Sequence, residues 1–268
     1  MQGSFAAGKE WFKPQNSMFG NLKTHPFPVS AHFDFSLVLT YALPQETLQP
    51  LLPPHLEPDG FGNQGFVAVA MVQTRHLRPS IFPAFMGQSF FLIGYRIFVK
   101  YHTTGGKRLR GLYILRSETN RPLMKTMGNV FTHYNYSVTD IAYQQEEKAI
   151  RVSSQQSGFE VAVNWKSDDV ALPPGSPFAG WKQARRFAGP LPFTFDYEKT
   201  TGSMMIVQGV RQHWEPHPVA VERANVAFFD HAPFAQTKPV LANAFVVENI
   251  PYRWEKGRRE TQTALAGK

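Results

Sequence analysis

The stretch QSFFLIGYRIFVKYHTTGGKRLRGLYILRSETNRPLMKTMGNVFTHYNYSVTDI, residues 88–141, decides the fold. Its first part, 90–102, is rich in Phe, Tyr, Ile and Val, and its side chains alternate between two faces as in a β-strand. Gly105 and Gly106 supply the positive φ angles that a tight reversal needs. The pattern therefore predicts a hairpin whose second strand covers 109–117.

A helix and a further strand are expected after the hairpin. Pro122 suits the first turn of a helix, which we expect to cover 123–131. Residues 133–143 are again aromatic and predict a strand. A second short helix is expected at 178–187, after a Ser-Pro start signal. The other predicted strands are 31–41, 65–76, 149–154, 159–165, 193–197, 204–213, 219–229 and 244–254.

The composition is that of a globular protein dominated by β-sheet. Of the 268 residues, 43% are hydrophobic and 18% are charged, which excludes a disordered chain. The absence of Cys excludes disulfides, thiolate nucleophiles and thiolate metal ligands. No apolar run approaches the length of a membrane span, so we expect no membrane partner and a cytoplasmic location.

The formal net charge of +8 raises the question of a nucleic-acid partner. Much of the excess positive charge lies near the two ends of the chain, and a further basic cluster at 107–110 lies at the predicted hairpin tip. No alternation of basic and aromatic residues and no known nucleic-acid motif accompanies these charges. We therefore do not expect a nucleic-acid partner.

The chain divides into three parts. Residues 1–28 mix Gly, Lys, Pro and Phe without periodicity and are expected to form an N-terminal arm. Residues 29–255 contain the predicted strands and helices, without internal repeats, and are interpreted as a single domain. Residues 256–268 form a basic C-terminal tail.

Two short motifs carry a resemblance to a known family. They are the Leu-Leu-Pro-Pro turn at 51–54 and the Tyr-Arg-Ile-Phe-Val strand at 95–99, in the element order described above. In this respect the chain resembles the acetoacetate decarboxylase-like superfamily, and within it the uncharacterised branch. The resemblance covers about 30–254. It implies an α+β, β-dominated fold, namely a closed or cone-like antiparallel β-barrel with a few short covering helices, and a homo-oligomer.

The chemistry that the resemblance implies does not carry over intact. The decarboxylases of the superfamily use a lysine that forms a Schiff base with a β-keto acid, and this amine must be kept neutral to attack a carbonyl; acetoacetate decarboxylase is itself the standard example of such an activated lysine. In this sequence, the order of the motif places the corresponding Pro-Lys pair near His133 and Tyr134. Since a phenol cannot form an imine, the reaction class of the decarboxylases does not carry over to this sequence.

Arg96 is the first candidate binding residue. A guanidinium does not lose its charge in proteins, so on the inner face of a barrel it needs either a carboxylate partner or an anionic ligand. Glu118 is a candidate partner because the hairpin joins the two strands. The sequence leaves both interpretations open: a structural ion pair, or a site that binds the carboxylate of a ligand.

Five other residues are candidates for the same site. Lys100 shares the face of Arg96, and Lys125 lies on the predicted helix; either amine could bind substrate if buried, whereas an exposed lysine would only be solvated. His133 and Tyr134 are candidate acid–base groups together with Glu118. Tyr136 shares a face with Tyr134 and is a candidate substrate-binding residue, although aromatic strand residues commonly serve only packing.

No cofactor or metal is expected. The sequence contains no phosphate-cradling loop, dinucleotide fingerprint or nucleophile elbow. Pro216 lies between His213 and His217 and argues against a zinc-binding helix there. The leading hypothesis is a barrel that binds a small anionic or carbonyl-bearing molecule, with lyase-like proton transfer if it is an enzyme. The alternative is a barrel that binds a small ligand, or serves as a scaffold, without catalysis.

Overall fold

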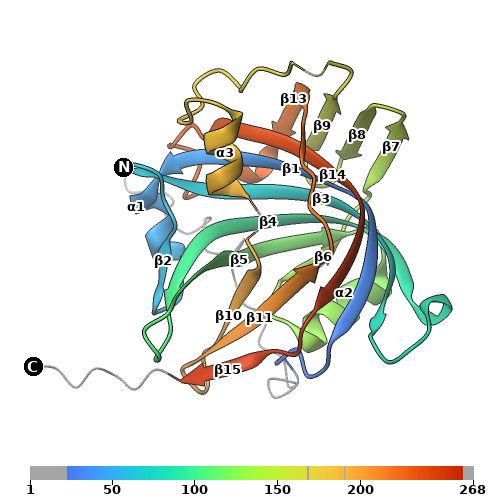
Figure 1. Cartoon of the computed structure of the whole chain (residues 1–268), viewed down its shortest axis with the longest axis vertical. Coiled ribbons are helices and arrows are strands. Elements are labelled where there is room, and N and C mark those ends of the chain that lie inside the picture. The colour runs from blue at the N-terminus through green and yellow to red at the C-terminus, as the bar shows by residue number, and fades with distance from the viewer. Residues whose placement is uncertain (1–22, 168, 190, 262–268) are drawn as a thin grey trace, which may run out of the picture.

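The computed structural model describes residues 23–167, 169–189 and 191–261, and most of these residues lie in β-strands. Seven strands pair in the order β14–β1–β3–β4–β5–β10–β11, and β11 pairs again with β14, so the hydrogen bonding closes a ring (Figure 1). The strands of the ring are β1 (Val29–Pro44), β3 (Gln64–Pro79), β4 (Gln88–His102), β5 (Arg108–Thr119), β10 (Phe193–Glu198), β11 (Ser203–Arg211) and β14 (Val240–Trp254). The β-dominated class expected from the sequence is confirmed.

The hairpin β4–β5 forms as the sequence predicts. Gly106 has a φ of 75°, and Tyr101 faces Leu109 across the two strands. Tyr95 pairs with Arg116 but Arg96 pairs with Ile114, so Leu115 is an extra residue in β5 and marks a β-bulge in that strand. A bulge moves every side chain beyond it to the other face relative to the partner strand. This slip decides which residues of β5 share a face with Arg96.

A smaller sheet covers one face of the ring. Its order is β13–β9–β8–β7, and it lies at the top of the view in Figure 1. Val152 and Val161 of this sheet pack in one core with Phe35 and Ile93 of the ring, and all four are at most 1% exposed. Burial of such side chains is the main stabilising contribution of this layer. Its strands are β7 (Ala142–Glu146), β8 (Ala149–Ser154), β9 (Phe159–Asn164) and β13 (Ala220–Val226).

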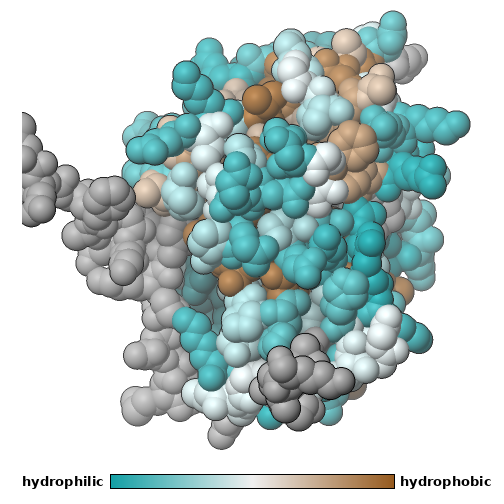
Figure 2. Space-filling view, turned by 90° about the vertical axis from the view of Figure 1, so that its left-hand side faces the viewer, coloured by the Kyte–Doolittle hydropathy of each residue, from teal (hydrophilic) through white to brown (hydrophobic). Residues whose placement is uncertain are grey.

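Short helices and strands complete the fold. Among the described residues no helix is long and apolar enough to cross a membrane. Hydrophilic side chains cover much of the face seen in Figure 2, which is the side of α1 and β2. The remaining elements are α1 (Gln45–Leu48), η3 (Gln49–Leu51), β2 (Leu56–Pro58), η4 (Ala84–Met86), α2 (Pro122–Phe131), β6 (Tyr136–Val138), α3 (Trp181–Ala188), β12 (His217–Pro218), η5 (Ala227–Asp230) and β15 (Arg258–Thr261).

Some predicted boundaries differ from the structure. The strand expected at 133–143 is two separate strands, because β6 pairs in parallel with β5 whereas β7 belongs to the small sheet. Helix α3 begins at Trp181, since the hydroxyl of Ser176 donates to the carbonyl of Ala242 and does not cap a helix. The tail expected from residue 256 contains β15, which pairs with β11. Residues 1–22 of the expected arm and 262–268 of the tail lie outside the described residues.

Candidate functional site

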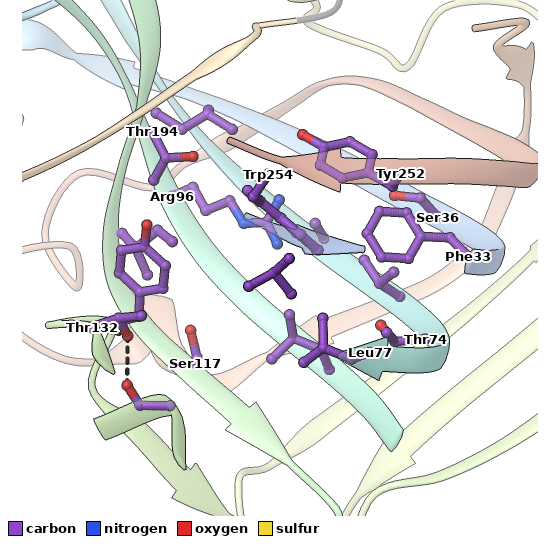
Figure 3. A pocket seen from close by; sticks show the side chains of 18 of the residues that line it. Phe33, Ser36, Thr74, Leu77, Arg96, Ser117, Thr132, Thr194, Tyr252 and Trp254 are labelled. Carbon is purple, nitrogen blue, oxygen red and sulfur yellow. Dashed lines mark hydrogen bonds between the residues drawn. The ribbon is translucent and has the colours of Figure 1, made fainter. Parts of the chain in front are cut away.

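A cavity of about 240 Å³ lies inside the ring. Each of the seven ring strands contributes side chains to its lining, so the ring encloses it (Figure 3). Helix α2 and residues 25–27 of the arm also contribute. Most lining side chains are aliphatic or aromatic, which is usual for sites of small organic ligands. Polar lining groups from the ring strands include Ser36, Thr74, Arg96, Ser117, Thr194, Arg211 and Tyr252.

Arg96 points into this cavity from β4 (Figure 3). Its side chain folds back over Gly94, where an added Cβ would lie 2.9 Å from Nε of Arg96. Nε is buried and has no hydrogen-bond partner among the described residues. The side chain of Arg96 is half-buried: protein surrounds it, and its accessible surface faces the cavity. Burial lowers the pKa of Arg96, but a guanidinium remains charged at physiological pH.

The structure does not pair Arg96 with Glu118. Without the bulge at Leu115 of β5, Glu118 would lie opposite Leu92, on the face of Arg96; with the bulge it lies opposite Ile93, on the other face. There Glu118 forms an ion pair with Arg116, with Oε1 of Glu118 2.9 Å from Nη2 of Arg116. Burial raises the pKa of Glu118. Arg96 and Glu118 therefore do not form the candidate ion pair, and Glu118 does not line the cavity.

The two candidate lysines also lie outside the cavity lining. Lys100 sits further along β4, where its Nζ lies 3.4 Å from a carboxylate oxygen of Glu57. Lys125 is exposed on α2, whereas Met124 and Gly128 of the same helix face the cavity. No lysine occurs among the described residues that line the cavity. The described lining therefore offers no amine for an imine.

Three tyrosines border the cavity: Tyr134, Tyr136 and Tyr252. Burial raises the pKa of Tyr136 to about 12, and it also raises the pKa values of Tyr134 and Tyr252. All three phenols are therefore protonated at neutral pH and can donate hydrogen bonds. Tyr252 was missed in the sequence, although the alternation of the last long strand places it on one face with Trp254.

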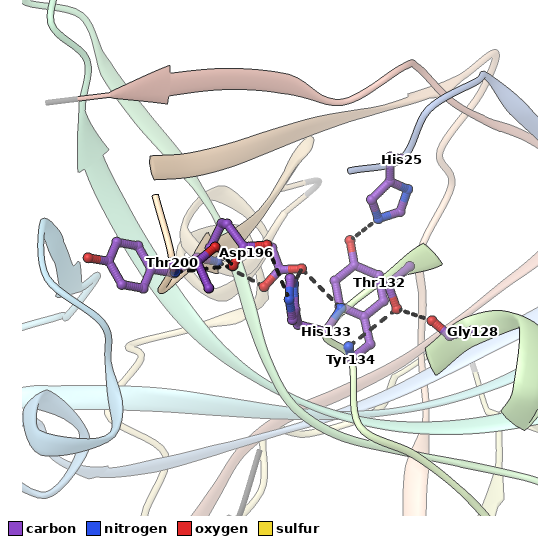
Figure 4. Close-up of polar contacts among 9 residues, drawn as sticks. His25, Gly128, Thr132, His133, Tyr134, Asp196 and Thr200 are labelled. Atoms are coloured by element: carbon purple, nitrogen blue, oxygen red, sulfur yellow. Dashed lines mark hydrogen bonds and ion pairs between the residues drawn. The ribbon is translucent and has the colours of Figure 1, made fainter. Parts of the chain in front are cut away.

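A histidine of the arm contacts one of these phenols. Nε2 of His25 lies 2.8 Å from the hydroxyl oxygen of Tyr134 (Figure 4). Burial lowers the pKa of His25 to about 4, so the imidazole is neutral at pH 7. In the tautomer protonated on Nδ1, Nε2 of His25 accepts a hydrogen bond from the hydroxyl group of Tyr134. His25 was assigned to the arm from sequence, because nothing in the local pattern shows that residues 25–27 dock on the ring.

His133 turns away from the cavity. Its Nδ1 lies 2.8 Å from a carboxylate oxygen of Asp196, and its Nε2 lies 3.8 Å from one of Glu198 (Figure 4). The backbone N–H of His133 also donates to Asp196. His133 is thus adjacent to Tyr134 in the chain but does not line the cavity. Among the described residues, no group of three His, Asp or Glu side chains is placed to hold a metal ion.

A family model matches most of the chain. The family model DUF2071, described as "Uncharacterized conserved protein", matches residues 31–262. Comparison with curated proteins gives no match.

Solved structures also resemble the chain. An acetoacetate decarboxylase-like enzyme from Sphingomonas wittichii RW1 shares 14% identity over 87% of this chain and 92% of that chain, with a TM-score of 0.55. The enduracididine biosynthesis enzyme MppR complexed with pyruvate shares 11% identity over 87% and 90%, with a TM-score of 0.55. Acetoacetate decarboxylase from Legionella pneumophila subsp. pneumophila str. Philadelphia 1 shares 13% over 99% and 100%, with a TM-score of 0.54. At such identities the likeness concerns the fold.

Proposed function

This chain belongs to the DUF2071 family, whose model matches residues 31–262, and on this premise we propose that its cavity binds a small carboxylic or keto acid. The observation that carries the proposal is Arg96: a buried guanidinium that points into the cavity with no carboxylate partner among the described residues. Carboxylates are the natural complement of a guanidinium, which binds them through two parallel hydrogen bonds. The mostly apolar lining suits the rest of a small organic acid.

The shape of the ring belongs to the same proposal. We infer that the ring is the closed, cone-like β-barrel of the acetoacetate decarboxylase-like superfamily. The second pairing of β11, with β14, supports closure, and the solved acetoacetate decarboxylase-like structures share the fold. A homo-oligomer and a cytoplasmic location stay predictions, which sedimentation velocity and cell fractionation would test.

If the protein is an enzyme, its chemistry is proton transfer next to a carbonyl, as in a lyase-like reaction without an imine. Arg96 would hold the carboxylate, and the phenols of Tyr134, Tyr136 and Tyr252 would donate hydrogen bonds to a carbonyl or enolate oxygen. His25 would exchange a proton with Tyr134, to which it is hydrogen-bonded. Asp196 raises the pKa of His25 against the larger effect of burial. Glu118, Lys100, Lys125 and His133 have no direct part, because they do not line the cavity.

Calorimetric titration tests the binding proposal. The ligands are 2-oxobutyrate, butyrate and the uncharged butanone; the proteins are the wild type, Arg96→Met and Arg253→Met. Arg253 is an exposed arginine of β14, paired with Glu255, and it controls for loss of one positive charge. We expect both acids to bind, Arg96→Met to weaken them by about thirtyfold or more, and Arg253→Met to leave them unchanged. Equal binding by all three proteins would overturn the proposal.

Binding without catalysis is the second candidate function. It is favoured by the protonation states: all three lining phenols keep their protons at neutral pH, and no Lys, Asp or Glu is found among the described lining residues. Proton NMR in D₂O separates the two candidates by following exchange of the C3 hydrogens of 2-oxobutyrate. An enzyme accelerates this exchange, and Tyr134→Phe slows it; a binding protein leaves it at the rate in buffer.

A further inference from the structure

Two other arginines border the same cavity: Arg78, whose guanidinium donates to the backbone carbonyls of His76 and Phe82, and Arg211. Arg211 ends β11, directly opposite Tyr252 of β14, and it is among the lining residues. Its guanidinium lies over Trp214, 4.3 Å from the ring centroid, and 5.8 Å from the ring centroid of Tyr252. Stacking of this kind satisfies the faces of a guanidinium but not the N–H groups on its edge. Nη2 of Arg211 is buried and, among the described residues, has no hydrogen-bond partner.

Arg96 and Arg211 enter the cavity from opposite parts of the ring. Going one way round, β5 and β10 separate the strand of Arg96 from the strand of Arg211; going the other way, β3, β1 and β14 do. Both guanidiniums act on Tyr252, where they counter the effect of burial on the pKa of its phenol. Tyr252 is held beside Arg211 because Gly209 leaves room for its hydroxyl, which an added Cβ would strike.

The charges of the two arginines are not balanced by the lining. No Asp or Glu occurs among the described residues that border the cavity. A buried charge without a partner is costly. One carboxylate bound at Arg96 would leave the edge of Arg211 unpaired. A ligand with an anionic group at each end would satisfy both sites, with its apolar middle against the aliphatic and aromatic lining.

We propose that the cavity is a two-arginine site for a small dicarboxylate, with one carboxylate at Arg96 and the other at Arg211. This inference rests on the proposed function, since it assigns the second group of the same ligand. In this site Arg96 binds one carboxylate of every acid, and Arg211 selects dicarboxylates over monocarboxylates. Specificity of this kind arises because the monoacid leaves a buried polar group unpaired.

Matched pairs of acids test the inference by calorimetry. Pentanoate and glutarate have the same chain length and differ in the second carboxylate, as do 2-oxopentanoate and 2-oxoglutarate. In the wild type we expect each diacid to bind at least about tenfold more tightly than its monoacid. In Arg211→Met the diacid should fall to the level of the monoacid, while the monoacid changes less than about twofold. In Arg96→Met both acids should weaken.

Two further variants keep the result interpretable. Arg211→Lys retains the charge without the planar fork and should keep part of the preference for the diacid, which covers the case that Arg211→Met fails to fold. Arg253 is the exposed neighbour of Tyr252 in the sequence, and the variant Arg253→Met should keep the full preference for the diacid. If neither acid binds the wild type, the proposed function fails. If monoacids bind through Arg96 but diacids bind no better, or if Arg211→Met keeps the preference, only the two-arginine site is overturned.

Discussion

At the scale of single residues, the site depends on a positive charge that the described part of the protein does not neutralise. Nε of Arg96 is buried without a hydrogen-bond partner. Desolvation of a charge opposes folding, so a residue in this position reduces the stability of the ligand-free protein. An arginine that binds a ligand without a protein partner therefore lowers the stability of the ligand-free protein, whereas removal of an arginine from a structural ion pair would lower the stability.

Arg96→Met is expected to stabilise the ligand-free protein. The substitution removes an unpaired buried charge and keeps most of the side-chain volume, so the free energy of unfolding should rise by about 1 kcal/mol or more. Urea denaturation of wild type and variant measures this difference. A loss of stability of similar size would mean that Arg96 has a structural partner.

Gly94→Ala is expected to weaken ligand binding more than it changes stability. An added Cβ would lie 2.9 Å from Nε of Arg96 and 3.1 Å from its Nη2, so the guanidinium must move away from its present position. Because the end of a long side chain can shift, the fold should tolerate the change. Titration with butyrate measures the effect, with Gly105→Ala in the exposed hairpin turn as control. Equal affinity in both variants would contradict the placement of Arg96.

His25 predicts a specific dependence of stability on pH. Its pKa is about 4 in the folded protein, against 6.5 for an unperturbed histidine. Between these values the unfolded chain binds the proton and the folded chain does not, so stability falls as pH falls from 6.5 to 4. The stability lost between pH 7 and pH 4 is up to about 3 kcal/mol. Urea denaturation at several pH values in this range measures the free energy of unfolding, which should change less steeply with pH in His25→Asn than in the wild type. Identical slopes in the two proteins would count against a buried neutral His25.

At the scale of elements, the sequence predicts regular segments well and irregular pairing poorly. The hairpin β4–β5 and helix α2 follow from alternation, from glycines in the turn and from Pro122. The bulge at Leu115 of β5 carries no comparable signal, because the residues around it fit either register. That one slip turns Glu118 to the face opposite Arg96, so the candidate ion pair does not form, whereas the side chain of Arg96 points into the cavity.

The contact of α2 with β6 gives a prediction at this scale. Gly128 of α2 lies against the ring of Tyr136, and an added Cβ would collide with that ring. Gly128→Ala should push Tyr136 from its position and lower the free energy of unfolding by about 1–3 kcal/mol, despite the higher helix propensity of Ala. Thr126→Ala on the exposed side of α2 is the control. A stabilised Gly128→Ala variant would show that the helix does not press on β6.

At the scale of the whole molecule, the cavity exists because segments far apart in the sequence close a ring. Arg211 meets Tyr252 where β11 pairs with β14, and residues 25–27 of the arm reach the same cavity. Local patterns in a sequence specify faces of strands, but they do not specify which distant strands pair. For this reason Tyr134 and Tyr136 could be predicted as lining residues, whereas His25, Arg211 and Tyr252 could not be joined to them.

A crystal structure of the protein with glutarate tests the central claim, that a buried arginine in a closed ring binds a carboxylate. We predict one carboxylate of glutarate in the cavity with both oxygens at hydrogen-bond distance from the guanidinium of Arg96. A carboxylate bound outside the cavity, or a guanidinium of Arg96 paired instead with a carboxylate of the protein, would contradict the claim.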